Sequence, residues 1–350
     1  MSTTTQLIEP APFPLPSAAR AVRGPLVVAG VGSIGRRHLA NLRRLGVDDV
    51  ILYRTGHGGR EAYLPDAVIE TDLDAALSYR PAAVLVCNPT AVHVPVALEA
   101  ARAGCALFME KPISHSLDGL TELAGEIERR RLTVLLGFQF RFHPTLRRIR
   151  EWIALGEIGD VVSVRAHWGE YLPDWHPYED YRASYSARRD LGGGVVLTLS
   201  HPFDYLRWLI GEVVEVSAFT GRRSGLGLEV EDLAQVCLRF SNGALGTVSL
   251  DYAERPPSHE LHIIGRRGSI RWNDADGIAW LQTDETSRRI AARPPHGFDR
   301  NAMFLDEMRH FLACLAGDAA PACRFEDGVA ALRIALAAKQ SAARGRSVDV

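Results

Sequence analysis

The stretch Leu26-Val27-Val28-Ala29-Gly30-Val31-Gly32-Ser33-Ile34-Gly35 decides the fold class. Its four apolar residues predict a buried strand, and the glycines that follow form the pattern G-x-G-x-x-G. Beyond them, Leu39, Leu42 and Leu45 have helical spacing. A glycine-rich turn between a strand and a helix is the setting in which this pattern binds the pyrophosphate of a dinucleotide.

The residues of this loop have separate expected roles. Gly30 permits the tight turn, Gly32 lets the backbone approach the pyrophosphate, and Gly35 lets the helix pack closely on the strand. The first helical turn adds amide donors and a partial positive charge. The cofactor-binding residues expected here are Gly30, Gly32, Ser33, Ile34, Gly35 and Arg36.

Strand and helix patterns alternate as far as Leu136. Strands are predicted at 26–29, 50–53, 67–69, 83–87, 106–109 and 133–136, with helices at 72–79, 91–103 and 116–131 between them. Continuous apolar strands separated by helices indicate a parallel sheet covered on both faces. Residues 23–137 are therefore expected to form an α/β, doubly wound, dinucleotide-binding domain.

The pattern changes after Phe138. A helix at 144–155 precedes a strand at 161–168, and the runs between Glu212 and Leu281 alternate with period two. This alternation predicts a largely antiparallel sheet with one wet face, followed by helices at 298–316 and 325–344. We expect an α+β domain over 138–345. Residues 1–22, which lack a signal-peptide pattern, are expected to be a disordered tail.

Composition excludes several classes of protein. Hydrophobic residues make up 47% and charged residues 23%, as in ordinary globular proteins, so disorder over most of the length is excluded. A net charge of −2 provides no global basic field, and no apolar run is long enough to cross a bilayer. The five cysteines are widely spaced, and the sequence contains neither a CxxC nor an HExxH motif. We therefore expect a cytoplasmic protein with no nucleic-acid or membrane partner and no metal.

The end of the second predicted strand bears on the choice of cofactor. NAD enzymes usually place an acid about 20 residues beyond the glycines, where it holds the ribose 2′-OH. Here the sequence is Leu52-Tyr53-Arg54-Thr55, with His57 and Arg60 nearby and no acid. Arg54 can pair with a 2′-phosphate, although an arginine that merely faces solvent is the alternative. NADP(H) is predicted as the preferred cofactor, with NAD(H) possible.

The chain contains two lysines, Lys111 and Lys339, and all its other cations are arginines. An amine in such a chain hints at a position that must exchange protons near neutral pH, which a guanidinium cannot do. Lys111 stands in Glu110-Lys111-Pro112, directly after a predicted strand. This tripeptide behind an N-terminal G-x-G-x-x-G resembles the Gfo/Idh/MocA family of sugar and cyclitol oxidoreductases.

The resemblance extends over nearly the whole chain from Pro25. Further segments similar to the family, in the same order, are Asn88-Pro89-Thr90 with His93, Phe138 to Pro144, and Gly192-Gly193-Gly194 followed by His201 and Asp204. The resemblance implies a Rossmann domain and a second domain whose open sheet floors the substrate site and often mediates oligomerisation. A homo-oligomer through the C-terminal sheet is therefore expected.

The resemblance also implies hydride transfer between nicotinamide C4 and a carbinol or carbonyl of a sugar, sugar derivative or cyclitol. Lys111 would be the catalytic residue beside the nicotinamide and the substrate hydroxyl, His201 a second acid/base group, and Pro112 the former of a turn through a cis bond. Cofactor contacts are further expected from Asn88, His93, Glu110 and Lys111. The residues expected at the substrate are Lys111, Arg141, Trp168, Tyr185, Arg188, His201 and Asp204.

Some of these expectations have alternatives. The aromatic and basic segment 169–190 suits a sugar ring or an anionic substituent, but it could instead be an interface or lid that touches no ligand. Thr198 stands where the family commonly has an aspartate, and a hydroxyl cannot hold the charge that polarises an imidazole. The alternatives are a non-catalytic dinucleotide-bound sensor or partner-binding protein, a glycosidase that cycles its cofactor, or an imine reductase.

Overall fold

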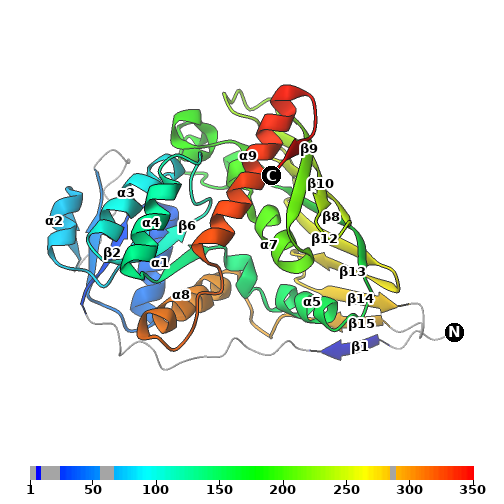
Figure 1. The fold of residues 1–350 in the computed structure, drawn as a ribbon, viewed down its shortest axis with the longest axis horizontal. Coiled ribbons are helices and arrows are strands. Elements are labelled where there is room, and N and C mark those ends of the chain that lie inside the picture. The colour runs from blue at the N-terminus through cyan, green and yellow to red at the C-terminus, as the bar shows by residue number, and fades with distance from the viewer. Residues whose placement is uncertain (1–4, 9–23, 56–66, 284–288) are drawn as a thin grey trace. The chain divides into compact units, whose positions relative to one another are not determined.

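The computed structural model describes residues 5–8, 24–55, 67–283 and 289–350, which belong to two compact units (Figure 1). The parallel-sheet unit comprises Pro14–Gln139 and Asp299–Val329. The mixed-sheet unit comprises Met1–Phe13, Phe140–Phe298 and Ala330–Val350. The predicted second domain, 138–345, differs from this division because residues 299–329 belong to the parallel-sheet unit.

Six parallel strands form the first sheet, in the order β4-β3-β2-β5-β6-β7. They are β2 (Leu26–Ala29), β3 (Val50–Tyr53), β4 (Val68–Glu70), β5 (Ala83–Val86), β6 (Ala106–Glu110) and β7 (Val134–Gly137). Every residue of β2, β5, β6 and β7 is buried, which explains their continuous apolar runs.

The helices of this unit are α1 (Ser33–Arg44), α2 (Leu73–Ser78), α3 (His93–Arg102), α4 (Leu120–Arg130) and α8 (Arg300–Ala316), with the single turn η2 (Thr90–Val92). Helix α8 packs on α1, where Asn301 Nδ2 donates to Asn41 Oδ1 at 2.9 Å. After α8, the Cys323 carbonyl accepts the Leu136 amide of β7 at 3.0 Å. These contacts explain why a C-terminal segment completes the N-terminal unit.

The strand order creates a switch point between β2 and β5. From β2 the chain crosses to β3 on one side, and from β5 it crosses to β6 on the other. Because parallel crossovers are right-handed, α1 and α3 are expected to cover opposite faces, and the carboxyl ends of strands at such a switch point are where α/β sheets bind ligands. The glycine loop follows β2, Asn88 follows β5, and Lys111 follows β6.

Ten strands form the second sheet, in the order β1-β15-β14-β13-β12-β8-β11-β10-β9-β16. In chain order they are β1 (Thr5–Ile8), β8 (Val161–Gly169), β9 (Val213–Gly221), β10 (Leu233–Phe240), β11 (Leu245–Asp251), β12 (Ser258–Gly265), β13 (Gly268–Asn273), β14 (Ala279–Thr283), β15 (Arg289–Ala292) and β16 (Val348–Asp349). The pairs β1–β15 and β8–β11 are parallel and the others antiparallel. The prediction of a disordered tail is wrong for Thr5–Ile8, because that segment pairs with β15.

The helices of this unit are α5 (Pro144–Ala154), α6 (Val195–Thr198), α7 (His201–Ile210) and most of α9 (Phe325–Arg344). Its single turns are η3 (Gln139–Phe142), η4 (Leu172–Asp174), η5 (Tyr181–Ala183), η6 (Tyr185–Ala187) and η7 (Arg189–Leu191). Helices α5, α7 and α9 cover one face of the sheet (Figure 1). No helix among the described residues is long and apolar enough to span a membrane.

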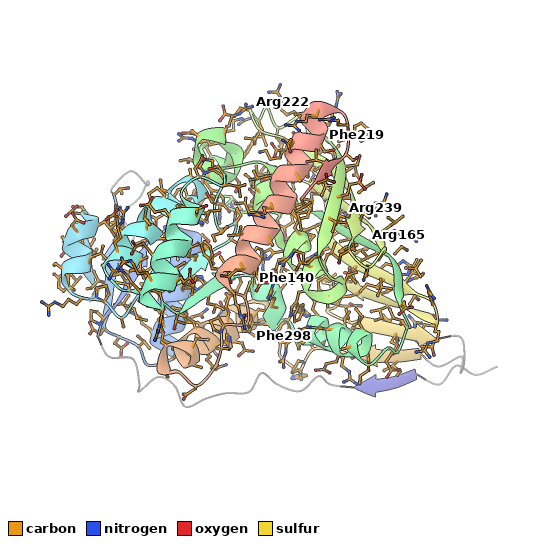
Figure 2. All side chains as sticks on the ribbon, viewed as in Figure 1. Phe140, Arg165, Phe219, Arg222, Arg239 and Phe298 are labelled. Atoms are coloured by element: carbon orange, nitrogen blue, oxygen red, sulfur yellow. The ribbon has the colours of Figure 1, made fainter. Side chains whose placement is uncertain are left out.

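Side chains of the central strands alternate between this covered face and an open one. On β8, Val164, Ala166 and Trp168 are buried beneath the helices, while Arg165 is exposed. Figure 2 shows Arg165, Phe219 and Arg239 on the open side of the sheet. Phe219 is 80% exposed there. The period-two pattern thus produces a sheet with one packed face and one open face.

Candidate active site

The three glycines of the loop after β2 have different surroundings. A Cβ on Gly30, whose φ is +96°, would lie 2.6 Å from the Asn88 amide nitrogen, and one on Gly35 would lie 1.9 Å from the Gly30 carbonyl oxygen. Gly32 is exposed, and no described atom outside its neighbours lies within 4 Å of where its Cβ would be. The packing of the protein therefore requires Gly30 and Gly35 but gives no reason for Gly32.

A dinucleotide supplies that reason. Its pyrophosphate needs close access to backbone amides, which a side chain at position 32 would obstruct. Helix α1 starts directly after Gly32, has no acid in its first turn, and begins with an exposed Ser33. Ile34 is half-buried, and the exposed Arg36 donates from Nε to the Val31 carbonyl at 3.0 Å, which braces the loop. The expected cofactor residues thus fit the group at this loop.

Two further residues lie at the same edge of the sheet. Asn88, after β5, has a buried Oδ1 without a hydrogen-bond partner in the described structure. Arg54 follows β3, is half-buried, and is anchored by its amide, which donates to the Glu70 carbonyl at 3.0 Å. His57 and Arg60 lie outside the described residues. The Asn88 oxygen is a polar group suited to a ligand.

Lys111 is half-buried at the end of β6, and its bond to Pro112 is cis, as predicted. Glu110 was expected to contact the cofactor. Its carboxylate is instead occupied by protein groups, with Oε1 at 2.7 Å from His38 Nε2 and Oε2 accepting the Lys111 amide at 3.2 Å. Glu110 therefore holds the segment that carries the lysine.

His93 also has a different role from the one expected. Its Nδ1 lies 2.9 Å from the Pro112 carbonyl oxygen and its Nε2 lies 2.8 Å from that of Asn88. Burial lowers the pKa of the ring, against the opposing effect of these two carbonyls. Because the ring is 1% exposed, it links the turn after β5 to the turn after β6 and does not offer a free face to a nicotinamide.

In the mixed-sheet unit, His201 is the first residue of α7 and is 1% exposed. Its ring stacks on Trp168 with 5.3 Å between centroids, and Trp168 in turn stacks on His259 at 4.4 Å. Trp168 was expected to bind substrate, but it is 4% exposed and its Nε1 donates to Glu170 at 2.8 Å. It therefore packs between two imidazoles, and its visible role is to hold the His201 ring.

Arg141 and Asp204, both expected at the substrate, form a buried ion pair with each other. Arg141 Nε donates to Asp204 Oδ2 at 3.0 Å and a terminal nitrogen donates to Oδ1 at 2.6 Å. Their side chains are 5% and 1% exposed. This two-pronged pairing ties α7 to the segment before α5, so structural anchoring is the role that the geometry supports for both.

Thr198 ends α6 and shares a side-chain hydrogen bond with Tyr252. Burial raises the pKa of the Tyr252 phenol well above its ordinary value, and the Thr198 bond acts in the opposite direction. Tyr185 is half-buried, and the exposed Arg188 pairs with Asp190 at 3.0 Å. Thr198 thus belongs to a neutral hydroxyl pair where the family pattern has a charge.

The sequence interpretation missed His38 and His259. His38 lies one helical turn before Leu42, and this spacing on the buried side of α1 is a signal that could have identified it as an interior polar residue. His259 is in β12 and its Nε2 lies 3.2 Å from the Tyr205 phenol, a contact that no local pattern reveals. Both histidines are buried next to residues that the resemblance singled out.

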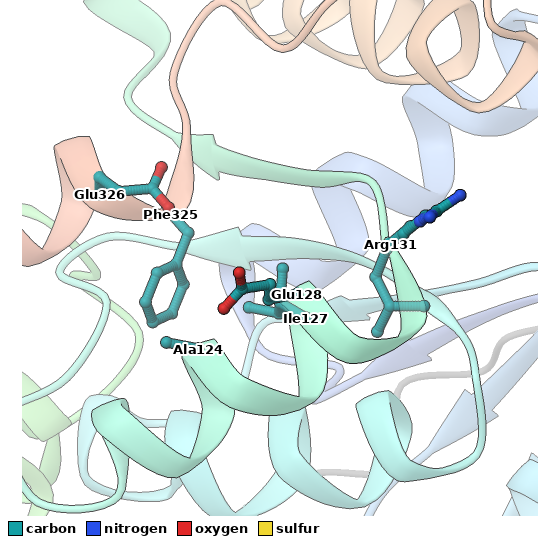
Figure 3. Close-up of a pocket in the computed structure, with 7 residues that line it drawn as sticks. Ala124, Ile127, Glu128, Arg131, Phe325 and Glu326 are labelled. Atoms are coloured by element: carbon teal, nitrogen blue, oxygen red, sulfur yellow. The ribbon is translucent and has the colours of Figure 1, made fainter.

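Two other features lie apart from these residues. On the open face, His167, Asp251 and Glu254 place their polar atoms within 4.8 Å of one another, and His167 Nε2 lies 2.5 Å from Glu254 Oε2 in a hydrogen bond. A pocket beside α4 is shown in Figure 3. It is lined by Ala124, Ile127, Glu128, Arg131, Leu132, Phe325 and Glu326. None of the predicted site residues lines that pocket, so it does not mark the site.

The fold and the glycine loop are those of a dinucleotide-binding protein. Residues 25–138 match the oxidoreductase family with an NAD-binding Rossmann fold, and residues 146–271 match the GFO/IDH/MocA C-terminal domain. The chain belongs to the Gfo/Idh/MocA family of oxidoreductases.

Similar proteins cover almost the whole chain. The myo-inositol 2-dehydrogenase of Thermotoga maritima is 29% identical, over 92% of this chain and 97% of that protein. A levoglucosan dehydrogenase solved with NADH and levoglucosan is 19% identical with a TM-score of 0.81, over 93% of this chain and 98% of that one. GenD2 from gentamicin A biosynthesis, solved with NAD, is 26% identical with a TM-score of 0.78, over 94% and 97%.

Proposed function

We propose that this protein interconverts a ring hydroxyl and a ketone on a cyclitol or sugar, with NADP(H) as its preferred cofactor. The observation that carries the proposal is the placement of Gly32, Asn88 and Lys111 at the carboxyl ends of three neighbouring strands. The myo-inositol and levoglucosan dehydrogenases named above support a substrate that is a hydroxyl-rich ring.

The residues of the chain have separate proposed roles in cofactor binding and proton transfer. The amides of Gly32 and Ser33, two exposed residues at the start of α1, would hold the pyrophosphate, and a bound nicotinamide would supply the hydride acceptor or donor at C4. Lys111 hydrogen-bonds the reacting oxygen, takes its proton during oxidation and returns it during reduction. For His201, whose ring stacks on Trp168, the proposal keeps the role of second acid/base group that the family resemblance implies.

The test is NAD(P)⁺-dependent oxidation of a panel of ring polyols, beginning with myo-inositol, followed at the absorbance of the reduced cofactor. The proposal expects one reduced cofactor per ketone formed. Turnover of a glycoside without net cofactor consumption would support internal cycling, and reduction of a ketone only with an amine present would support an imine reductase. Tight cofactor binding with no reaction on any substrate class would favour a sensor.

The cofactor preference rests on Arg54. A charge-assisted bond to a 2′-phosphate contributes about 1.5–3 kcal/mol, so we expect at least tenfold tighter binding of NADPH than of NADH. Arg54→Ala should weaken NADPH binding about tenfold and leave NADH binding within about twofold. Fluorescence titration measures both. An equal loss of affinity for the two cofactors in Arg54→Ala, or a preference of the wild type for NADH, would contradict the assignment of Arg54 as the phosphate ligand.

The open face of the mixed sheet supports self-association. Two large apolar side chains are exposed on this face, Phe219 at 80% and Leu245 at 52%. Together with the family resemblance they support an interface here, and the expected occupant is the same face of a second copy. Light scattering should return the mass of a dimer or a larger even-numbered oligomer, and a monomeric mass would contradict this assignment.

A further inference from the structure

Glu110 and His38 are two buried polar residues that the catalytic proposal leaves without a role. We propose that Glu110, held by His38, is a positioning residue that fixes the Lys111 backbone and keeps a permanent negative charge beside it. This inference rests on the proposed function of Lys111. All of its parts lie within the parallel-sheet unit.

The carboxylate of Glu110 is divided between two tasks. Oε1 faces His38 Nε2 on α1 at 2.7 Å, and Oε2 accepts the Lys111 amide at 3.2 Å. The neighbouring strand makes room for it, because Gly137 is registered with Glu110 and a Cβ there would lie 3.2 Å from the carboxylate. One side chain thereby joins the helix after the glycine loop to the residue expected to move the proton.

The surroundings of His38 bear on how it contacts Glu110. His38 is 0% exposed, packs edge-on against Phe108 at 4.8 Å, and its Nδ1 has no hydrogen-bond partner among the described residues. The described contact of the ring with a polar group is therefore the one from Nε2 to the Glu110 carboxylate at 2.7 Å. The proposal takes the ring as the donor in this hydrogen bond and the carboxylate as the acceptor.

Other charged or titratable groups face this carboxylate from the elements around it. They are Arg37 on α1, Cys87 after β5 and His93 on α3, with Arg300 and Asp299 near Arg37 and Glu307 near Cys87. Burial lowers the pKa of Arg37 and of His93 and raises that of the Cys87 thiol, so Arg37 is the cation among the three at neutral pH. Glu110 Oε2 lies 3.2 Å from the Lys111 amide nitrogen, and the proposal is that the charge held there also favours the ammonium form of the Lys111 side chain.

The chain offers a direct readout, because Lys111 and Lys339 are its only lysines. The Lys339 amine pairs with Glu231 at 3.2 Å in the mixed-sheet unit and serves as an internal reference. Mass spectrometry on protein without substrate can follow the rate at which an amine reagent labels each lysine as pH is varied. These rates give the titration midpoints of Lys111 and Lys339. In Glu110→Gln, we expect the Lys111 midpoint to fall by about 0.5–1 pH unit and the Lys339 midpoint to stay in place.

Turnover supplies the second readout. Glu110→Gln should lower kcat at least tenfold while cofactor Kd stays within about threefold, and Glu110→Asp, which keeps the charge, should restore the Lys111 midpoint. His38→Leu should lower kcat, and His38→Gln, which keeps a donor, should recover most of it. His310→Gln removes another buried histidine of the same unit and should lower the melting temperature without moving the Lys111 midpoint.

A folded Glu110→Gln variant with wild-type kcat and an unmoved Lys111 midpoint would overturn the proposal. If that variant does not fold, Glu110→Asp and the two His38 variants decide in its place, and failure of His38→Gln to recover what His38→Leu loses would count against it. Absence of wild-type turnover would contradict the proposed function instead, and the labelling result would still stand.

Discussion

The edge of the parallel sheet and the aromatic cluster of the mixed sheet are two regions whose residues differ in exposure. At the sheet edge, Gly32 and Ser33 are exposed, as expected for residues that receive a ligand. In the cluster, Trp168, His201 and Asp204 are at most 4% exposed and pack against other side chains. A site built from backbone geometry can be located from glycine spacing. A site built from side chains depends on partners that arrive from distant segments.

Asp204→Asn gives the largest expected effect on stability. It leaves the Arg141 guanidinium buried without its counter-charge, which should cost about 3–5 kcal/mol in the free energy of unfolding. Denaturant unfolding measures this loss of stability. The control is Asp190→Asn, which removes an exposed ion pair with Arg188 and should leave the unfolding midpoint unchanged. A rise in substrate KM at unchanged stability would instead support the predicted substrate role of Asp204 and weaken the contrast between the two regions.

The two glycines of one loop sharpen the comparison further. Gly35→Ala must displace the Gly30 carbonyl, so it should destabilise the unit by more than about 2 kcal/mol. Gly32→Ala meets no described protein atom and should leave the melting temperature unchanged while weakening cofactor binding about tenfold. Melting curves with and without cofactor separate the two effects. A destabilised Gly32→Ala variant would mean that the protein, and not the ligand, requires that glycine.

Much of the fold could be predicted because it rests on local periodicity. The six parallel strands and the glycine loop follow from apolar runs and turn residues, and the central hairpins from period-two alternation. The strand Thr5–Ile8 could not be predicted, because its partner β15 lies near the other end of the chain. The assignment of residues 299–329 to the first unit depends equally on distant contacts, such as α8 on α1.

The candidate site residues could be predicted from the sequence only in part. The motifs single out Gly32 and Lys111, whose roles stay predictions, but nothing local indicated that Glu110 pairs with His38, or Arg141 with Asp204. Such pairs join residues separated by 72 and 63 positions, and their formation depends on burial that only the tertiary fold defines. The sequence assigned several polar residues to ligands, and for Glu110, Arg141 and Asp204 the structure shows protein partners.

The smallest expected effect is that of His143 on the pH dependence of stability. Burial lowers its pKa to about 3, and its Nδ1 lies 2.9 Å from the Thr145 hydroxyl, which itself donates to the Gly277 carbonyl. In the unfolded chain this histidine has a pKa near 6.5, so it binds a proton more readily there than in the folded protein. The stability that the neutral ring contributes above about pH 6.5 is therefore lost as pH falls toward 3.

Through this one histidine, the free energy of unfolding changes by up to about 1.4 kcal/mol per pH unit. His143→Gln should remove that part of the slope between about pH 6 and pH 4, measured by denaturant unfolding at several pH values. The exposed His296→Gln is the matched control and should follow the wild type. Parallel stability curves for wild type and His143→Gln would contradict a neutral buried ring.

The central claim is that Lys111 moves the proton of an oxidoreductase reaction whose cofactor is bound independently by the glycine loop. The most direct test measures cofactor Kd and kcat on the same preparations of wild type, Lys111→Ala and Lys111→Arg, with Lys339→Arg as the matched control. The account predicts that both Lys111 variants lose about 10²–10⁴-fold in kcat with cofactor Kd within about threefold, while Lys339→Arg keeps wild-type turnover. Retained turnover in Lys111→Ala would contradict it.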